Sequence, residues 1–421
     1  MTDAAAGRLK QEVRVVGVVS SGHFMSHCYS MMLPPLFPLL HAELGVSYTA
    51  LGLLLSLRAL SFGTMQLPAG VLVDRFGARA LLVCGLGLIL ICYSIIAMAD
   101  TFWIIGAMFL ISGIGDAIIH PADYAIMNGS VSAERMGRSF SAHTFGGSMG
   151  MAVAPAAVLF LIGAFGWSWR QVMMAFVVAG LLVIAGLLTQ WSYIREDGRK
   201  PKQAKAPDTG AGAEQTTWQV VVEILTSAPM LFLLLFFSFS SLGSGAFKNF
   251  AVAGLVSLHG TSLEAAGGAL TGFLTATAVG ALVGGFVADR FGRHAFTAAM
   301  ALIVSAGIAV LVGLVDLHAT VLAFVFSLAG LLQGIIRPAR DMMIRAASPK
   351  GSIGKAFGFV MSGQAVGGAL APIVFGAILD IGAPEWLFYG SAIFLMVCML
   401  SVLGSAHEMK KVVLHRKGTD G

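Results

Sequence analysis

Long apolar runs alternate with short polar loops along the whole of this chain. Each run is close to the length of about 20 mostly apolar residues that a helix needs to cross the hydrocarbon core of a bilayer. The pattern therefore predicts an all-α membrane protein with twelve transmembrane helices. We expect these helices near residues 13–40, 47–70, 80–99, 102–128, 138–163, 170–190, 219–257, 264–287, 295–315, 319–346, 356–380 and 385–405.

Two of the loops carry one motif, Gly-x-x-x-Asp-Arg-x-Gly, which begins at residue 70 in the first half of the chain and at residue 285 in the second. His120-Pro121 likewise matches Arg337-Pro338 at a separation of 217 residues, as does Ala154-Pro155 with Ala371-Pro372. Duplicated halves of this size recur in secondary transporters. The repeat predicts two pseudo-symmetric six-helix bundles and a polar cytoplasmic linker between them. Their expected bounds are 1–190 for the first bundle, 191–218 for the linker, and 219–421 for the second bundle with a short cytoplasmic tail.

Composition and charge exclude other classes of protein and indicate the orientation in the membrane. Hydrophobic residues make up 57% of the 421 residues and charged residues 11%, with a mean hydropathy of +0.85, which excludes an ordinary soluble domain. Nearly all the basic loops fall on one side of the predicted helices, so both termini are expected in the cytoplasm and the protein in the inner membrane. The net charge of +5 is spread over many loops, which argues against nucleic-acid binding. The expected partners are the lipid bilayer, protons and a small-molecule substrate, and the expected state is a monomer.

Together, the doubled loop motif, the twelve predicted helices and the polar middle segment resemble the major facilitator superfamily. The stretch from Gly115 to Pro121 further resembles the fosmidomycin-resistance-like branch of drug and metabolite transporters. This second resemblance implies efflux of a drug or metabolite. The fifth predicted helix departs from the antiporter pattern, because its glycines are followed by Ala154-Pro155 where antiporters often have Gly-Pro. Antiport therefore stays open.

The same resemblance implies that the two loops latch the cytoplasmic side when the cavity faces outward. Asp74 and Asp289 would cap or pair with a neighbouring helix, and the arginines would anchor to acidic groups or lipid headgroups. The alternative is that these are only turn residues and positive-inside residues. The predicted latch comprises Gly70, Asp74, Arg75, Gly77, Arg79, Gly285, Asp289, Arg290, Gly292 and Arg293.

Three ionisable residues of the fourth predicted helix are spaced to share one face. Asp116, His120 and Asp123 are four and three positions apart, which aligns them on a helix. Ionisable groups inside a membrane mark functional sites by default, so this face is the predicted proton-coupling site. The alternative is a satisfied polar patch that ties helices together.

Isolated basic residues predict a mildly positive cavity that favours an anionic solute. On the tenth predicted helix Asp341 is four residues from both Arg337 and Arg345, which predicts a structural ion-pair ladder of Asp341 and Arg345 with Arg337. Arg340 is left without a partner on that helix, so it is free to bind an anion or to pair with Asp123. The predicted substrate-binding residues are Arg58, Lys248, Arg337, Arg340, His23, His27, Asn249 and Gln364.

His23 and His27 are four residues apart, a spacing that can bind zinc, although a zinc site needs further ligands from elsewhere. The predicted helix offers none at matching spacing, so we predict no metal and no cofactor, and expect these histidines to line the cavity, handle protons or pack. The chain has no Gly-x-x-x-x-Gly-Lys-Ser/Thr loop, so ATP is not the expected energy source.

These features predict a secondary active transporter, not an enzyme, that moves a small organic anion or amphiphile by alternating access. Proton coupling is expected, with efflux slightly favoured over uptake of an organic acid by symport. Two other classes remain open: an intramembrane enzyme acting on lipid or prenyl substrates, and a receptor that does not transport.

Overall fold

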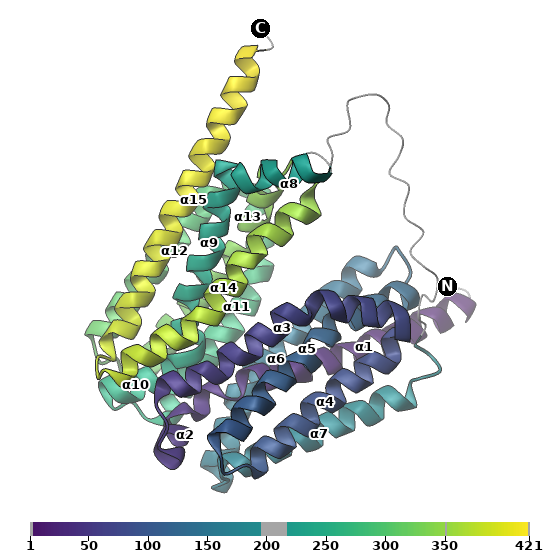
Figure 1. Ribbon diagram of the computed structural model, residues 1–421, viewed down its shortest axis with the longest axis vertical. Helices are drawn as coiled ribbons and strands as arrows, with labels where there is room; N and C mark the ends of the chain where they lie inside the picture. Colours follow the sequence, from purple (N-terminus) through teal and green to yellow (C-terminus); the bar gives the residue numbers. More distant parts are fainter. Residues whose placement is uncertain (1–2, 195–216, 350–351, 420–421) are drawn as a thin grey trace. The chain divides into compact units, whose positions relative to one another are not determined.

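The computed structural model describes residues 3–194, 217–349 and 352–419, and its regular elements are all helical (Figure 1). The predicted linker 191–218 lies mostly outside these residues. The described chain forms two compact units. The first contains α1 (Asp3–Met31), η1 (Pro34–Leu36), α2 (Phe37–Leu44), most of α3 (Tyr48–Phe76), α4 (Ala78–Met98), α5 (Phe102–Ser130), α6 (Met136–Phe165) and α7 (Trp169–Thr189). The second contains α8 (Thr217–Thr226), α9 (Ala228–Gly245), η2 (Ala246–Phe250), α10 (Ala251–His259), α11 (Leu263–Phe291), α12 (His294–Leu314), α13 (Ala319–Ala347), α14 (Ile353–Asp380) and α15 (Glu385–Thr419).

Eleven helical segments of the described chain are long and apolar enough to cross a membrane, where the sequence predicted twelve. The first predicted helix, 13–40, is the exception. The helix α1 ends at Met31, and the prolines at 34 and 35 start a short 3₁₀ turn before α2. Serines and histidines also interrupt the apolar run of α1. These polar residues reduce its hydropathy, and two of them belong to the histidine cluster described below.

The predicted helix 219–257 is also divided in the structure. The separate helix α8 comes first, and the membrane-length segment Ala228–His259 follows. Inside that segment the five residues Ala246–Phe250 form a π-helix between α9 and α10. Such π-turns are rare and occur often at functional sites.

The helices of the two units pack in matching pairs. In the first unit α1 packs against α6, and α4 packs against α5 and α7. In the second unit α9 packs against α14, and α12 packs against α13 and α15. These three pairs of helices therefore correspond between the two units.

Glycines allow two of these matching pairs to approach closely. A Cβ added at Gly150 of α6 would lie 2.2 Å from the Phe24 carbonyl oxygen of α1, and one at Gly367 of α14 would lie 2.2 Å from the Ser238 carbonyl oxygen of α9. Gly150 and Gly367 are themselves 217 residues apart. Close contact between small residues is a common way to pack membrane helices.

Glycines also shape the duplicated loops. Gly77 ends α3 with a φ of +92°, and Gly292 ends α11 with a φ of +57°. Residues with a Cβ rarely adopt such angles, which explains the glycine at the end of each motif.

Candidate functional site

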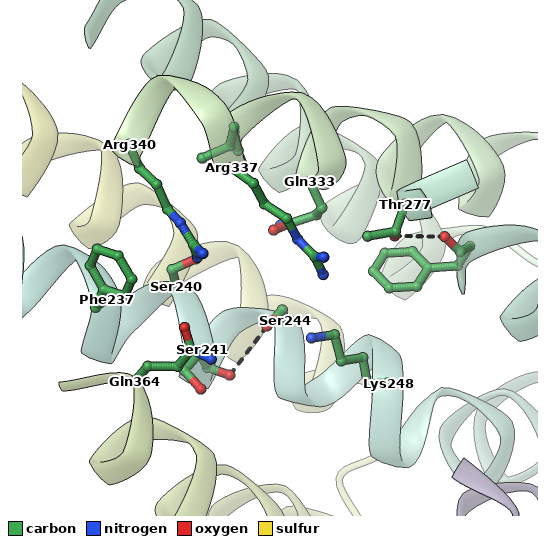
Figure 2. Close-up of a pocket in the computed structure, with 12 residues that line it drawn as sticks. Phe237, Ser240, Ser241, Ser244, Lys248, Thr277, Gln333, Arg337, Arg340 and Gln364 are labelled. Atoms are coloured by element: carbon green, nitrogen blue, oxygen red, sulfur yellow. Dashed lines mark hydrogen bonds between the residues drawn. The ribbon is translucent and has the colours of Figure 1, made fainter. Parts of the chain in front are cut away.

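A small cavity of about 200 Å³ lies inside the second unit, bounded by residues of α9, η2, α11, α13 and α14. Three cationic side chains reach it, and Figure 2 shows the ends of Lys248, Arg337 and Arg340 pointing into the same space. None of the described residues that line it is acidic. The other polar groups are hydroxyls and amides of Ser240, Ser241, Ser244, Thr277, Gln333 and Gln364.

Local backbone structure explains how each cation reaches the cavity. Lys248 lies in the π-helix η2, where the extra residue of the turn changes the direction of the side chains. Arg337 and Arg340 are three residues apart on α13 and therefore share a face of that helix. Of the predicted substrate residues, Gln364 also lines this cavity, whereas Asn249 does not.

The structure corrects the predicted ion-pair ladder on α13. Asp341 pairs with its chain neighbour Arg340, whose Nε donates to Oδ1 at 3.1 Å. The Arg340 guanidinium also lies over the Phe237 ring, 4.6 Å from its centroid, and this position directs Nε toward the carboxylate. Arg345 is exposed and takes part in none of the ion pairs found among the described residues. Arg337 is thus left without the predicted carboxylate partner.

The charge balance of this cavity favours an anion. The carboxylate of Asp341, on the same helix as the two arginines, is 46% exposed and is already paired with Arg340. A buried cation without a partner is costly, and guanidinium groups bind carboxylate or phosphate oxygens through two parallel hydrogen bonds. The cavity volume is below the roughly 300–1,000 Å³ of drug-sized sites, so it suits a small ligand.

Arg58 and Asp116 form an ion pair in the first unit, which corrects the view of Arg58 as an isolated cation. Its Nη2 donates to Oδ2 of Asp116 at 2.9 Å, and both side chains are 11% exposed. The helices α3 and α5 approach closely here, because a Cβ at Gly113 would lie 2.4 Å from the Arg58 carbonyl oxygen. Asp116 is therefore engaged with a cation, and Arg58 is less available to a substrate than predicted.

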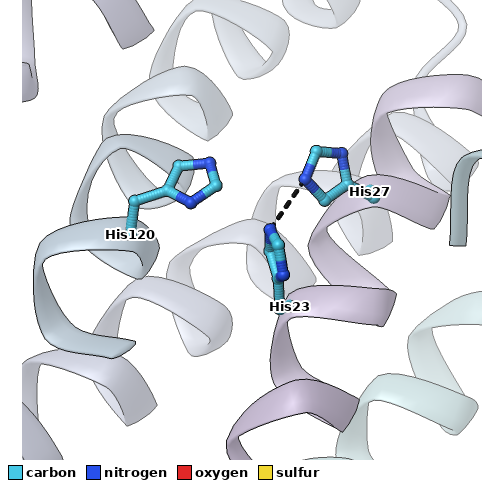
Figure 3. Close-up of side chains that lie close together, drawn as sticks. All are labelled: His23, His27 and His120. Atoms are coloured by element: carbon cyan, nitrogen blue, oxygen red, sulfur yellow. Dashed lines mark hydrogen bonds between the residues drawn. The ribbon is translucent and has the colours of Figure 1, made fainter. Parts of the chain in front are cut away.

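Four histidines gather beside this ion pair. Figure 3 shows His23 and His27 of α1 facing His120 of α5. The Nε2 atoms of His23 and His27 are 2.9 Å apart, and the ring centroids of His23 and His120 are 5.0 Å apart. His143 of α6 stacks on His23 with centroids 4.1 Å apart. The predicted proton face of α5 thus meets histidines from two other helices.

Asp123, the third residue of that face, is completely buried. Neither of its carboxylate oxygens has a hydrogen-bond partner among the described residues. The nearest basic atom in an ion-pair geometry is Nε2 of His143, at 3.4 Å from Oδ2. Asp123 and His143 form a buried acid–base pair. The sequence left open a pairing of Arg340 with Asp123, but Arg340 pairs with Asp341 in this structure and Asp123 lies next to His143.

The comparisons with known proteins agree with this architecture. The sequence profile described as the Major Facilitator Superfamily matches residues 19–258 and 238–417. The chain belongs to the Major Facilitator Superfamily. Members of this superfamily are membrane transporters, and the chain is a multi-pass membrane protein of that type.

Two curated relatives and one solved structure are similar to this superfamily member over most of its length. An uncharacterized MFS-type transporter, YfnC of Bacillus subtilis, is 27% identical over 86% of both chains. The fosmidomycin resistance protein of Escherichia coli is 23% identical over 95% of this chain and 94% of its own length. A bacterial homologue of the human lysosomal transporter Spinster, crystallised inward-facing and unoccupied, has the same fold with a TM-score of 0.74 at 16% identity, covering 96% of this chain and 98% of that one.

The residues of the predicted latch lie in this superfamily member at the ends of α3 and α11 and in the turns that follow. Asp74 and Arg75 are exposed, and the guanidinium of Arg75 lies over the Phe76 ring at 5.3 Å. The guanidinium of Arg79 contacts Trp191, because its Nη1 donates to the Trp191 carbonyl oxygen at 3.1 Å. A Cβ added at Gly70 or Gly285 would meet open space, so packing in this structure does not require glycine there. The side chain of Asp289 is outside the described part of the chain.

Apart from Gln364, the sequence did not single out the hydroxyl and amide residues of the cavity. The repeat could have found several of them, because His23, His27 and Asp116 correspond at the separation of 217 residues to Ser240, Ser244 and Gln333. The same separation relates Asp123 to Arg340 and His120 to Arg337. Equivalent positions therefore carry titratable groups in the first unit and cations with hydroxyls in the second.

Proposed function

We propose that this protein is a proton-coupled secondary transporter of a small organic anion, working by alternating access of two six-helix bundles, 1–190 and 219–421, joined by the linker 191–218. In this proposal α1 supplies the twelfth membrane-spanning helix. The protein is a monomer in the inner membrane with both termini in the cytoplasm, and it is a transporter rather than an enzyme.

The cavity in the second unit carries this proposal. Lys248, Arg337 and Arg340 converge on a space of about 200 Å³ with no acidic lining residue. Hydroxyls and the Gln364 amide beside them can orient the oxygens of a carboxylate, sulfonate or phosphonate group. A larger amphiphile fits this volume less well than a small anion does.

Proton coupling is assigned to the first unit. Asp123 and His143 are both buried, and an anionic carboxylate without hydrogen bonds is costly there. Such a group is suited to take up and release a proton as its surroundings change. Asp116 and His120 on the same helix face connect it to the Arg58 ion pair and to the other histidines.

Efflux is favoured over uptake because a relative that aligns over nearly the whole chain is named as a resistance protein.

The motif loops at Asp74 and Asp289 act as the cytoplasmic latch. The open space at Gly70 and Gly285 supports this role, since it leaves room for another helix to approach in a different state.

Reconstituted vesicles test the proposal. Small organic anions are first screened by their effect on the melting temperature of the purified protein, and each binder is then loaded into vesicles with an imposed pH gradient. We expect a binder to cross unchanged and faster with the gradient than without it. Chemical conversion of the solute without a gradient indicates an enzyme, and binding with neither movement nor conversion indicates a receptor; either result contradicts the proposal.

A further inference from the structure

Three histidines of the first unit converge on one point. A ring nitrogen from each of His23, His27 and His120 lies within 4.8 Å of the other two (Figure 3). The spacing of His23 and His27 was visible in the sequence, but the third ligand comes from α5, 93 positions beyond His27 in the chain. We propose that these three histidines form a binding site for a divalent transition-metal ion of the Zn²⁺ class.

The distances fit such an ion after small side-chain movements. Zinc binds imidazole nitrogen at about 2.0–2.1 Å, which places tetrahedral ligand atoms about 3.3 Å apart. The two Nε2 atoms of α1 are already 2.9 Å apart. Three histidines with an open fourth position form a known class of zinc site.

A hydrogen bond orients the most buried ligand. Nδ1 of His23 lies 3.1 Å from the backbone carbonyl oxygen of His143 and donates to it. This bond leaves the Nε2 lone pair of His23 directed toward His27 and His120. Histidine ligands of metals nearly always have a partner of this kind on the other ring nitrogen.

The donor set also selects the kind of ion. Imidazole nitrogens bind zinc, copper or nickel well, whereas magnesium and calcium prefer oxygen. The nearby carboxylate of Asp116 is held by Arg58, so it does not bring oxygen ligands to the site. His27 and His120 are partly exposed, which gives an ion and its water ligand access.

A second group overlaps this one, because His23, Asp123 and His143 also have ligand atoms within 4.8 Å of one another. All three of those residues are buried, whereas two of the three histidines in the first group are partly exposed, so an ion with a water ligand reaches the first group more easily. The two groups share His23, so one ion excludes the other. The more accessible group is therefore the site, and Asp123 with His143 stays available for protons.

Metal titration of purified protein tests this inference without any transport measurement. The protein is prepared without a polyhistidine tag, so that only its own histidines can bind metal. Binding is followed by competition with a chromophoric zinc chelator and by the visible spectrum of bound Co²⁺. We expect one Zn²⁺ per chain and a tetrahedral Co²⁺ spectrum. His27→Gln and His120→Gln should each weaken binding at least about 100-fold, more than loss of an outer-shell partner usually does.

Matched variants make the result decisive. His318→Gln changes an exposed histidine of the second unit and should bind as the parent does. His120→Cys should retain Co²⁺ and add a sulfur-to-metal absorption band, which a merely misfolded variant would lack. The inference is overturned if the parent binds no stoichiometric zinc, or if both glutamine variants bind normally. It is also overturned if His143→Gln abolishes binding while His120→Gln retains it, because the ion would then occupy the buried group.

Discussion

The guanidinium of Arg340 makes two contacts in the structure. Its Nε donates to Asp341, and its plane lies over the Phe237 ring. Its two terminal nitrogens are left for a ligand. We expect the affinity for the transported anion to fall in the order Arg340, Arg340→Lys, Arg340→Gln. The glutamine variant should lose about 10- to 100-fold in affinity, which corresponds to the loss of about one hydrogen bond to a charged group. Calorimetric titration of the purified variants measures this order.

Arg345→Gln is the control for that series, because Arg345 is exposed on the same helix and lines no part of the cavity. Its affinity should equal that of the parent. Normal binding by Arg340→Gln would leave Lys248 and Arg337 as the anion ligands and make Arg340 a partner of Asp341 only.

The buried carboxylate of Asp123 is predicted to carry the coupled proton. Asp123→Asn removes the exchangeable proton but keeps the size of the side chain, so gradient-driven transport should stop while counterflow exchange of the solute continues. Vesicle assays with and without a pH gradient measure both activities. Asp316→Asn, at an exposed position between α12 and α13, should change neither. If gradient-driven transport persists in Asp123→Asn, His143→Gln and His120→Gln alike, the proton is carried elsewhere.

At the scale of elements, glycines decide how closely α6 packs on α1. A Cβ at residue 150 would lie 2.2 Å from a backbone oxygen of α1, where no flexible side chain can move aside. Gly150→Ala should therefore destabilise the protein by about 1–3 kcal/mol, the usual cost of overpacking. Gly163→Ala on the same helix would meet open space and should be neutral or slightly stabilising. Thermal unfolding in detergent compares the two, and equal melting temperatures would show that α6 can shift freely.

The start of α1 is tied to the loop before α6 by one ion pair. Nε and Nη2 of Arg135 donate to the two carboxylate oxygens of Glu12 at 2.6 and 2.8 Å. These hydrogen bonds lower the pKa of Glu12, which precedes the first predicted transmembrane helix. A lowered pKa stabilises the fold above the unfolded value of about 4.3, and this contribution is lost as the pH falls through the lower folded value.

We therefore expect Glu12→Gln to melt at a lower temperature than the parent at pH 7, with the difference disappearing in acid. Melting curves across this pH range measure the effect. Arg135→Gln should behave in the same way, and the double variant should be no worse than either single one. A difference that does not depend on pH would mean that Glu12 acts through packing rather than charge.

At the scale of the whole molecule, Asp74 is predicted to stabilise the outward-facing state. Asp74→Ala should raise the labelling of a single cytoplasmic-side cysteine, introduced after Cys28, Cys84, Cys92 and Cys398 have been replaced. Thiol labelling of membrane vesicles measures the shift, and Asp316→Ala is the control. Unchanged labelling together with normal transport would contradict the latch, and the motif would then serve only as a turn that ends at Gly77.

The sequence predicted the membrane class and most of the helices, because long apolar runs and repeated motifs can be read directly from the chain. It missed the pairing of Arg58 with Asp116, since these residues are on different helices and nothing in their spacing indicates contact. It also missed the convergence of His120 and His143 on His23, which requires the packing of α1, α5 and α6. The predicted pairing of Asp341 with Arg337 and Arg345 was wrong. Arg340 lies over the Phe237 ring of another helix, and this position brings its Nε to Asp341, which the four-residue spacing on α13 does not indicate.

The π-turn at Ala246–Phe250 makes the position of Lys248 depend on chain length. A π-turn contains one residue more than the α-turn it replaces, and each residue of an α-helix advances the chain by about 100°. Deleting Asn249 would let the segment close as a regular α-helix, because the π-turn accommodates one extra residue, and the side chains inside the turn would change direction. The direction of the Lys248 side chain toward the two guanidinium groups would then change although no cation had been mutated. In this segment a one-residue insertion or deletion is a larger chemical change than most substitutions.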